Sequence, residues 1–182
     1  MNTYIKKFTI GFTAFVMAMA FNVMAHAKDF LVLKTSQGTV EIELLPNIAP
    51  NHVAQIKKLA NEGFYNGIVF HRVIEGFMAQ TGDPTGTGTG GSDEPNLNAE
   101  FSRTPFDRGV VGMARSQSRN SANSQFFIMF DQQYGLNNQY TAFGRVTKGM
   151  TAVDALQRGE GQGGIVPVGK RDKIIEASVV SR

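Results

Sequence analysis

The sequence predicts a mainly β domain built on a closed antiparallel sheet. Short β-prone segments recur along the chain, and most are joined by turns and loops rather than by the regularly alternating helices that parallel strands need. Two segments carry apolar residues at helical spacing. A length of 182 residues suits one domain with a short appendage. We therefore expect one closed sheet accompanied by a small amount of helix.

The domain opens on a predicted β-hairpin. Residues 29–36 are β-prone, residues 39–44 alternate between apolar and polar with period two, and the Gln-Gly pair between them suits a tight turn. A helix is expected from Pro50 to Gly63, because proline favours the first helical turn and glycine commonly follows the last. Its apolar residues would cover one face of the sheet.

The remaining predicted elements are short. Strand-like runs are expected at 68–74, 77–81, 110–114, 125–130, 142–146 and 173–180. A short amphipathic helix is expected at 150–158. Residues 82–108 are rich in glycine and polar side chains and form a long loop, and a loop of this length in a compact domain is more often functional than accidental.

Residues 1–27 have the three parts of a secretory signal peptide. Lys6 and Lys7 precede an apolar run over 10–21, and the small-x-small sequence Ala-His-Ala ends just before Lys28. An uncleaved membrane anchor is the alternative, but the apolar run is shorter than the roughly 20 residues that span a bilayer. We expect cleavage, a periplasmic or secreted domain over residues 28–182, and no stable membrane insertion afterwards.

Charge and composition exclude several classes of function. Removing two lysines with the signal leaves 18 − 2 = 16 basic residues against 15 acidic ones, a formal charge of +1. The basic residues are scattered, so nucleic-acid binding is not expected. The sequence has no cysteine, which excludes disulfides, thiolate catalysis and thiolate metal sites. Because one compact domain accounts for the length, we expect a monomer.

Metal, hydrolase and nucleotide sites are poorly supported. His52 is expected to face water and His71 to be a hydrogen-bonded core residue, and neither has paired acidic ligands at a metal-site spacing. The G-x-S-x-G elbow of a serine hydrolase is missing. Residues 86–91 fit G-x-G-x-x-G, but a dinucleotide site needs a strand before and a helix after this motif. A flexible loop is the favoured interpretation, with nucleotide binding as the alternative.

An arginine among apolar and amide side chains is the most informative pattern. Side chains at i and i+2 of a strand share a face, which places Met78 beside Gln80 and Gln125 beside Phe127, with Arg72 in the strand before them. Such a pocket suits an apolar ligand that carries amide carbonyls. The alternative is that Phe77, Met78 and Phe127 are ordinary core residues, and the pattern alone favours this alternative while leaving the pocket open.

Two segments carry a resemblance to a known family. The sequence F-H-R-V-I-E-G-F-M-A-Q-T-G-D over 70–83 resembles the cyclophilin signature F-H-R-x-I-x-G-F-M-x-Q-x-G-D, and S-Q-F-F-I over 124–128 resembles a second family segment. The likeness covers essentially all of residues 29–182. It implies an eight-stranded antiparallel β-barrel capped by two helices. The implied activity is cofactor-independent cis-trans isomerisation of X-Pro peptide bonds, assisting the folding of exported proteins, with proline-containing peptides and unfolded exported proteins as partners.

The resemblance also assigns roles to individual residues. Arg72 stands at the position of the catalytic arginine, which would donate a hydrogen bond to the prolyl nitrogen. The proline pocket would be formed by Phe77, Met78, Phe127 and Leu136. Gln80 and Gln125 would orient the arginine or bind the peptide. Ala114 and the backbone of Arg115 would pair with the extended substrate, and Tyr140 would be a further contact.

Three positions depart from the pattern of many eukaryotic members. Gly135 stands in place of a tryptophan, Tyr140 in place of a histidine, and Arg115 in place of an asparagine. We expect weak binding of cyclosporin without the indole, although Tyr134 lies close enough in sequence to fill part of the gap. The altered positions also motivate a second hypothesis, a chaperone or scaffold that holds proline-containing segments without turning them over.

Overall fold

The computed structural model describes residues 27–182, and the predicted signal peptide lies outside these residues except for Ala27. In chain order the elements are β1 (Asp29–Thr35), β2 (Gly38–Leu44), α1 (Pro50–Asn61), β3 (Arg72–Ile74), β4 (Met78–Thr81), β5 (Val110–Met113), β6 (Phe126–Met129), η1 (Tyr134–Leu136), β7 (Ala142–Lys148), α2 (Met150–Asp154), η2 (Val168–Lys170) and β8 (Ile174–Ser181). Each predicted strand segment overlaps one of these strands, and β2, β7 and β8 extend one or two residues beyond the predicted bounds. Within the described residues, no helix is both long and apolar enough to cross a membrane.

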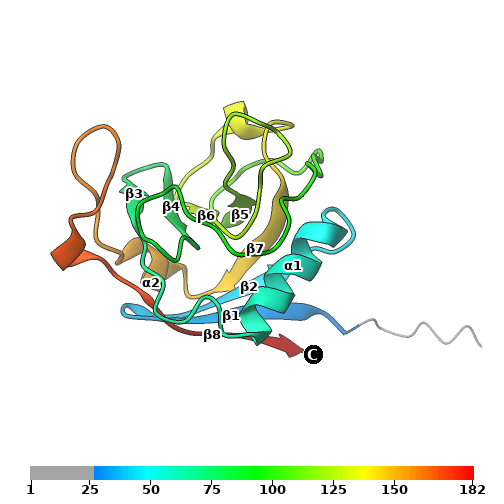
Figure 1. The fold of residues 1–182 in the computed structure, drawn as a ribbon, viewed down its shortest axis with the longest axis horizontal. Coiled ribbons are helices and arrows are strands. Elements are labelled where there is room, and N and C mark those ends of the chain that lie inside the picture. Colours follow the sequence, from blue (N-terminus) through cyan, green and yellow to red (C-terminus); the bar gives the residue numbers. More distant parts are fainter. Residues whose placement is uncertain (1–26) are drawn as a thin grey trace, which may run out of the picture.

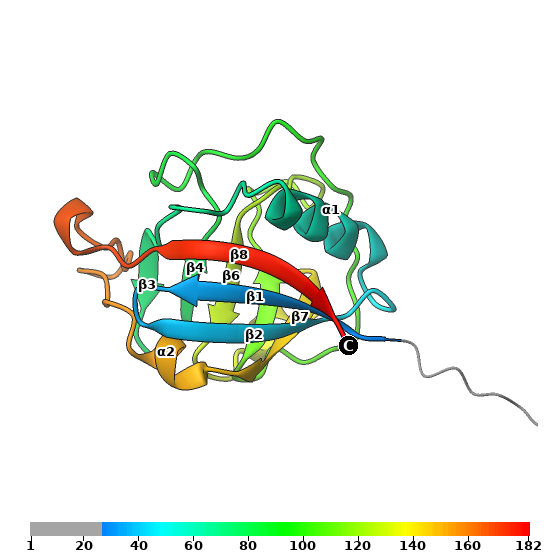
Figure 2. The ribbon, with the colours of Figure 1, turned by 90° about the horizontal axis from the view of Figure 1, so that it is seen from below.

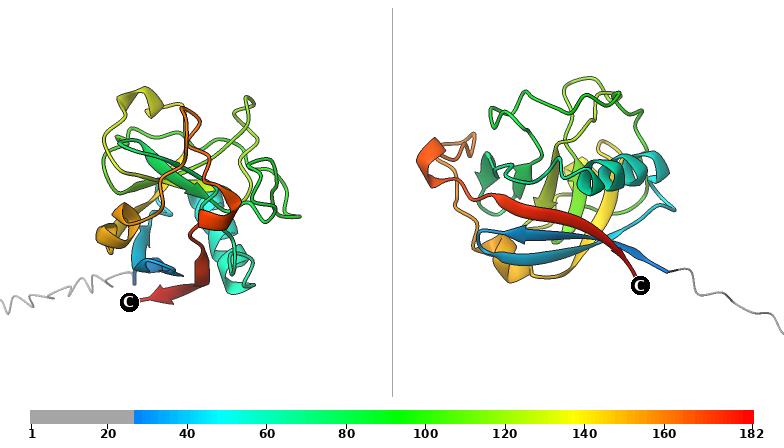
Figure 3. Two further views of the ribbon diagram at one scale, coloured as in Figure 1. Left: turned by 90° about the vertical axis from the view of Figure 1, so that its left-hand side faces the viewer. Right: turned by 60° about the horizontal axis from the view of Figure 1, so that its bottom comes forward.

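The eight strands form one antiparallel sheet in the order β3-β4-β6-β5-β7-β2-β1-β8. The sheet curls, so that β8, β1 and β2 form one wall and β3, β4 and β6 form the wall facing it (Figures 1 and 2). Helices α1 and α2 lie on opposite sides of this curled sheet (Figures 2 and 3). The prediction of eight antiparallel strands with two α-helices is confirmed.

The predicted closure of the sheet is confirmed only in part. Within residues 27–182, no continuous ladder joins the edge strands β3 and β8. The segments just before them meet instead, through an isolated bridge between Val69 and Lys173. Backbone hydrogen bonds of 2.9 Å from Phe70 N to Asp172 O and 2.8 Å from Ile174 N to Ile68 O flank this bridge. The sheet is therefore a strongly curled one with a short seam.

The core fills the space between the curled sheet and α1. On β2, Val40, Ile42 and Leu44 are buried and alternate with exposed or partly exposed neighbours, as the period-two pattern predicts. Leu31 and Leu33 of β1 are fully buried as well. Helix α1 contributes apolar residues at helical spacing, including Ile56 and Leu59. A smaller buried cluster lies under the candidate site, made of Met78, Phe106, Val110, Phe127, Met129 and Ala142. This second cluster supports the floor of the site.

The second helix is shorter than predicted. Helix α2 ends at Asp154, whereas the spacing of apolar residues predicted a helix to Arg158. The Arg158 guanidinium donates to the carbonyls of Asp154 and Leu156, at 2.8 and 2.6 Å. The Gln157 N–H is bound by the carboxylate of Asp172 at 2.7 Å. These hydrogen bonds stabilise residues 155–158 outside a regular helix. The local sequence pattern does not show such contacts, so it predicted a longer helix.

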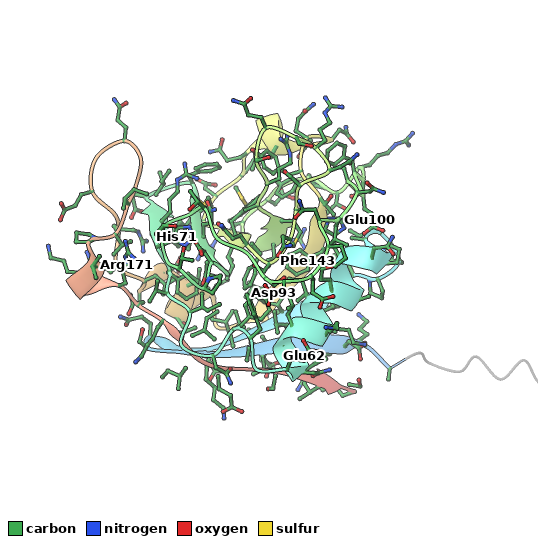
Figure 4. All side chains as sticks on the ribbon, in the orientation of Figure 1. Glu62, His71, Asp93, Glu100, Phe143 and Arg171 are labelled. Atoms are coloured by element: carbon green, nitrogen blue, oxygen red, sulfur yellow. The ribbon has the colours of Figure 1, made fainter. Side chains whose placement is uncertain are left out.

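His52 is buried rather than exposed to water as predicted. It is fully buried, and its Nδ1 lies 2.6 Å from a carboxylate oxygen of Glu100, which lies at the N-terminal end of α1 (Figure 4). The same carboxylate accepts the N–H groups of Asn51 and His52, each at 3.1 Å. Glu100 therefore caps a helix that has no side-chain cap of its own. Burial lowers the pKa of His52, and the contact with Glu100 opposes this effect.

Candidate functional site

A cavity of about 330 Å³ opens beside the β3-β4 hairpin. It is lined by His71, Arg72, Phe77, Met78, Gln80, Gly88, Ala114, Arg115, Phe127, Leu136, Tyr140 and Ile165. Nine of the ten predicted site residues are among them, and the tenth, Gln125, lines an adjoining cavity. The structure thus brings together the residues that the sequence comparison selected, while their individual roles stay predictions.

Strand register explains why these side chains share one face. Arg72 on β3 stands opposite Gln80 on β4, which stands opposite Phe127 on β6. Directly opposed residues of an antiparallel sheet project to the same side, so the three form a row across the hairpin and its neighbour. A second row joins Ile74, Met78 and Met129 in the same way. The tight turn between β3 and β4 therefore fixes the arginine beside an apolar floor.

Hydrogen bonds hold the Arg72 guanidinium from two sides. Its NH1 group donates to Gln80 Oε1 at 3.2 Å, and its Nε donates to the carbonyl of Gly163 at 3.0 Å. Gln80 in turn donates to Gln125 Oε1 at 2.8 Å. Within the described part of the chain, no carboxylate lies within ion-pair distance of Arg72. The arginine therefore keeps a fixed direction and an uncompensated charge at the cavity.

Aromatic contacts shape the apolar part of the cavity. Phe127 stacks on Phe106 with ring centroids 5.8 Å apart and meets Tyr140 edge to face at 5.7 Å. Phe127 and Met78 are almost fully buried, and both also line the cavity. Core packing and a ligand pocket, the two interpretations of these residues from the sequence, are therefore both correct. Phe127 and Met78 are core residues, and their outer surfaces line the cavity.

Tyr140 is held in place by Arg115. The Arg115 guanidinium lies 4.5 Å from the centroid of the Tyr140 ring. It also donates to the carbonyls of Gln139, at 3.0 and 3.1 Å, and of Ser116, at 2.9 Å. This clamp joins the segment after β5 to the segment before β7. Arg115 was expected to act through its backbone, but its side chain also contacts Tyr140, another residue that lines the cavity.

Replacing Arg115 with alanine is expected to lower kcat/KM for an X-Pro peptide by about two- to tenfold, with most of the change in KM, because an unclamped Tyr140 ring shapes the pocket less well. The NMR chemical shifts of the Tyr140 ring protons give a readout that does not depend on turnover. Arg119→Ala is the matched control, because Arg119 lies over the ring of Phe101 at 5.8 Å and does not line the cavity. Equal changes in both variants would contradict the assignment.

Position 135 carries no side chain toward the cavity. Gly135 is exposed, does not line the cavity, and a Cβ atom at this position would have no heavy atom within 4 Å. Tyr134 is 59% exposed and does not line the cavity, so it does not replace the indole of other family members there. Weak binding of cyclosporin stays a prediction that rests on the missing indole.

The glycine-rich loop is anchored rather than flexible. The carboxylate of Asp83 accepts the N–H groups of Thr85, Gly88 and Gly90 and the Thr85 hydroxyl. Burial opposes the charge of Asp83, but these donors hold its pKa down at about 2. Since the amide groups that a phosphate would need are bound by Asp83, the loop offers no support for nucleotide binding.

This loop also reaches the arginine through a chain of amides. Gln125 Nε2 donates to the carbonyls of Gly88 and Gly90, at 3.1 and 2.8 Å, and Gln125 accepts the hydrogen bond from Gln80. Its place at the end of the first motif is the one signal for Asp83 in the sequence pattern. The structure shows that Asp83, the loop, the two glutamines and Arg72 form one connected network.

His71, which Figure 4 shows at the β3 side of the molecule, also lines the cavity. It is 2% exposed, as predicted for a core histidine, but its ring nitrogens have no hydrogen-bond partner among the described residues. Burial lowers the pKa of His71, the charge of Asp83 raises it, and the nearby guanidinium groups of Arg171 and Arg72 lower it. A neutral ring beside Arg72 adds no competing positive charge to the site. Within residues 27–182, no group of three potential metal ligands is present.

A second, polar cavity of about 580 Å³ adjoins the first. The two cavities share Gln80, Gly88, Ala114 and Arg115. The second is lined mainly by polar side chains, with Asn96, Ser121 and Asn123 at the part away from the arginine. Because they share these lining residues, the two cavities form one continuous groove.

Comparison with known proteins yields a consistent set of matches. A family model described as cyclophilin type peptidyl-prolyl cis-trans isomerase/CLD matches residues 30–179. A probable peptidyl-prolyl cis-trans isomerase of Brucella suis is 54% identical over 167 residues, covering 85% of this chain and 84% of the relative. Peptidyl-prolyl cis-trans isomerase B of Bacillus subtilis is 43% identical over 123 residues, covering 66% and 85% respectively.

Solved structures give the same match. A cyclophilin type peptidyl-prolyl cis-trans isomerase of Cryptosporidium parvum, crystallised in the presence of the dipeptide Ala-Pro, has a TM-score of 0.77 and 29% identity, covering 84% of this chain and 99% of the neighbour. The cyclophilin AquaCyp293 of Hirschia baltica has a TM-score of 0.72 and 29% identity, covering 84% and 79%.

Proposed function

Because the chain belongs to the cyclophilin-type peptidyl-prolyl cis-trans isomerases, we propose that Arg72 and the apolar cavity beside it carry out the isomerisation. The isomerase activity of this family needs no cofactor. The observation that supports the assignment is the geometry of Arg72, whose guanidinium is held by Gln80 and by the Gly163 carbonyl at the edge of an apolar floor. No nucleophile or acid-base pair is required for the reaction.

Catalysis then consists of binding the twisted amide better than either planar form. Rotation about the X-Pro bond is opposed by a barrier of about 18 to 20 kcal/mol, which comes from double-bond character. At the twist the prolyl nitrogen becomes pyramidal and gains a lone pair. An N–H of Arg72 donates to this lone pair and opposes resonance, and a guanidinium fixed in advance needs little reorganisation to do so.

The proline ring occupies the floor formed by Phe77, Met78, Phe127 and Leu136. The residue before the proline pairs with the segment after β5, where the carbonyl of Ala114 and the N–H of Arg115 take part in no backbone hydrogen bond among the described residues. Extended peptides commonly bind to such free backbone groups. The Ala-Pro dipeptide named with the Cryptosporidium parvum neighbour supports a substrate of this kind.

The test is NMR exchange between the cis and trans signals of an X-Pro peptide, measured with the purified protein and with Arg72→Ala. Accelerated exchange that depends on Arg72 supports the proposal. Peptide binding without acceleration would favour the alternative, a module that holds proline-containing segments. The altered residues Gly135 and Tyr140 motivate that alternative, whereas the intact hydrogen bonds of Arg72 favour turnover.

We further propose that the protein acts outside the cytoplasm on exported proteins, since residues 1–27 have the pattern of a signal peptide. Slow prolyl isomerisation limits the folding of many chains, so an isomerase is useful where exported proteins fold.

Cell fractionation with N-terminal sequencing is expected to find a periplasmic or secreted chain that begins at Lys28. The double substitution Phe15→Arg and Val16→Arg interrupts the apolar run and is expected to leave the full-length chain in the cytoplasm. A full-length wild-type chain in the membrane fraction would instead establish an uncleaved anchor.

A further inference from the structure

Ile165 is the one residue after Tyr140 in the described chain that lines the first cavity. Its side chain is 50% exposed, while its neighbour Val166 is fully buried in the core. The core therefore does not use the side chain of Ile165, which presents apolar surface at the lip of the cavity next to Arg72. The catalytic roles proposed above leave this surface without a function.

The loop that carries Ile165 is attached to the free edge of β3. The N–H of Val73 donates to the carbonyl of Gly164 at 2.7 Å, the N–H of Gly159 donates to the carbonyl of Val73 at 2.9 Å, and the N–H of Val166 donates to the carbonyl of His71 at 3.0 Å. Figures 1 and 3 show the segment running beside β3. The backbone on both sides of Ile165 is therefore fixed to the strand that carries Arg72.

Close packing makes this attachment specific. A Cβ atom at Gly164 would lie 2.3 Å from Ile74 Cγ1, and the φ angle of Gly164 is +65°. Both facts require glycine at this position. Because the preceding residue, Gly163, is the one whose carbonyl binds Arg72 Nε, the position of Ile165 relative to the guanidinium is fixed. The apolar surface is thus organised before any peptide binds.

The two cavities give the groove a direction. Ala114 and Arg115 line both cavities, Asn123 lines only the polar one, and Ile165 lines only the first, where it forms an isolated antiparallel bridge with Arg72. If the residue before the proline pairs with Ala114 and Arg115, the earlier part of the peptide runs toward the polar cavity. The residue after the proline then leaves the pocket past Arg72 and meets Ile165.

The geometry points to Ile165 as a specificity-determining residue that favours an apolar side chain immediately after the proline. This inference rests on the proposed function, because it uses the position of the proline ring and of the preceding residue. The occupant is a single aliphatic or aromatic side chain of the substrate. Its contact with Ile165 removes apolar surface of both partners from water.

The test compares two peptides that differ only in the residue after proline, Ala-Ala-Pro-Leu and Ala-Ala-Pro-Gly, by NMR exchange. The wild-type protein is expected to have a higher kcat/KM for the leucine peptide. The ratio of the two values is expected to fall by about three- to tenfold in Ile165→Ala, as is typical for the loss of a few methyl or methylene contacts. Val168→Ala is the matched control, because Val168 is 81% exposed and does not line the cavity, and its ratio should equal that of the wild type.

Other outcomes overturn the inference. An unchanged ratio in Ile165→Ala, or an equal fall in Val168→Ala, would show that Ile165 does not select the residue after proline. A ratio that changes only when the residue before proline is varied would place Ile165 at the other side of the bond. If the wild-type protein accelerated neither peptide, the proposed function itself would fail, and this result is distinct from turnover without selectivity.

Discussion

Arg72→Ala is expected to lower kcat/KM for an X-Pro peptide by about 100- to 1,000-fold, the loss typical for removing a fixed donor that stabilises a transition state. Among residues 27–182, the side chain makes hydrogen bonds only with Gln80 and the Gly163 carbonyl, and it belongs to neither hydrophobic cluster. The free energy of unfolding should therefore change by less than about 1 kcal/mol. A large loss of turnover in a stable fold separates catalysis from packing.

Arg72→Lys gives the sharper comparison. A lysine keeps the positive charge but has one nitrogen, which would have to replace both the Nε contact to Gly163 and the NH1 contact to Gln80 before it could reach the substrate. We expect this variant to recover only a small part of the lost activity, at most about a tenth of the wild-type value. If charge alone were sufficient, lysine would restore most of it.

NMR exchange measures turnover, and thermal or denaturant unfolding measures the fold. Arg145→Ala is a suitable control, because Arg145 is an exposed residue of β7 that makes no ion pair in the described part of the chain. It removes the same charge at a distance from the cavity. Wild-type turnover in Arg72→Ala would show that another group stabilises the twisted amide.

The sequence predicted the site best where the site residues are close together in the chain. Arg72, Met78 and Gln80 lie on one hairpin, so their spacing determines which side chains share a face once the turn is recognised. Phe127 joins them through a second short motif whose strand pairs with β4. Period-two alternation likewise identified the buried residues of β2. In these elements the spacing of the residues alone determines which side chains share a face of the sheet.

Contacts between distant segments could not be predicted in this way. Gly163 and Ile165 reach Arg72 across more than 90 residues, through a loop whose sequence has no strand pattern. His52 was expected to face water because it lies at the start of the predicted helix, but it is buried against Glu100 from the long loop. The incomplete closure of the sheet has the same origin, since it depends on how residues 68–70 meet residues 172–174.

Asp83 is expected to have the largest effect on stability among the residues of the site. Asp83→Ala removes the acceptor of the hydrogen bonds from Thr85, Gly88 and Gly90 and leaves these donors without a partner. Asp83 is 1% exposed, and the loss of a buried charged acceptor costs about 2 to 4 kcal/mol of unfolding free energy. The activity should fall as well, because Gln125 would lose fixed positions for the Gly88 and Gly90 carbonyls that orient it.

The pH dependence of stability tests the same contacts without relying on a truncated side chain. The pKa of Asp83 is about 2 in the folded protein, below its ordinary value of 3.8, so the unfolded chain binds more protons between these values. The stabilisation is fully present above pH 3.8 and is lost as the pH falls toward 2; a shift of this size corresponds to about 2 kcal/mol. Asp83→Asn cannot titrate there.

The difference between the unfolding free energies of the wild type and Asp83→Asn should therefore shrink by about 2 kcal/mol between pH 4 and pH 2. Comparing the two proteins cancels the titration of other carboxyl groups that the substitution does not touch. A constant difference over this range would mean that Asp83 does not bind the loop as a carboxylate. Parallel losses of stability and of kcat/KM at neutral pH in Asp83→Asn would be expected, since the loop that Asp83 holds is also the loop that orients Gln125, Gln80 and finally Arg72.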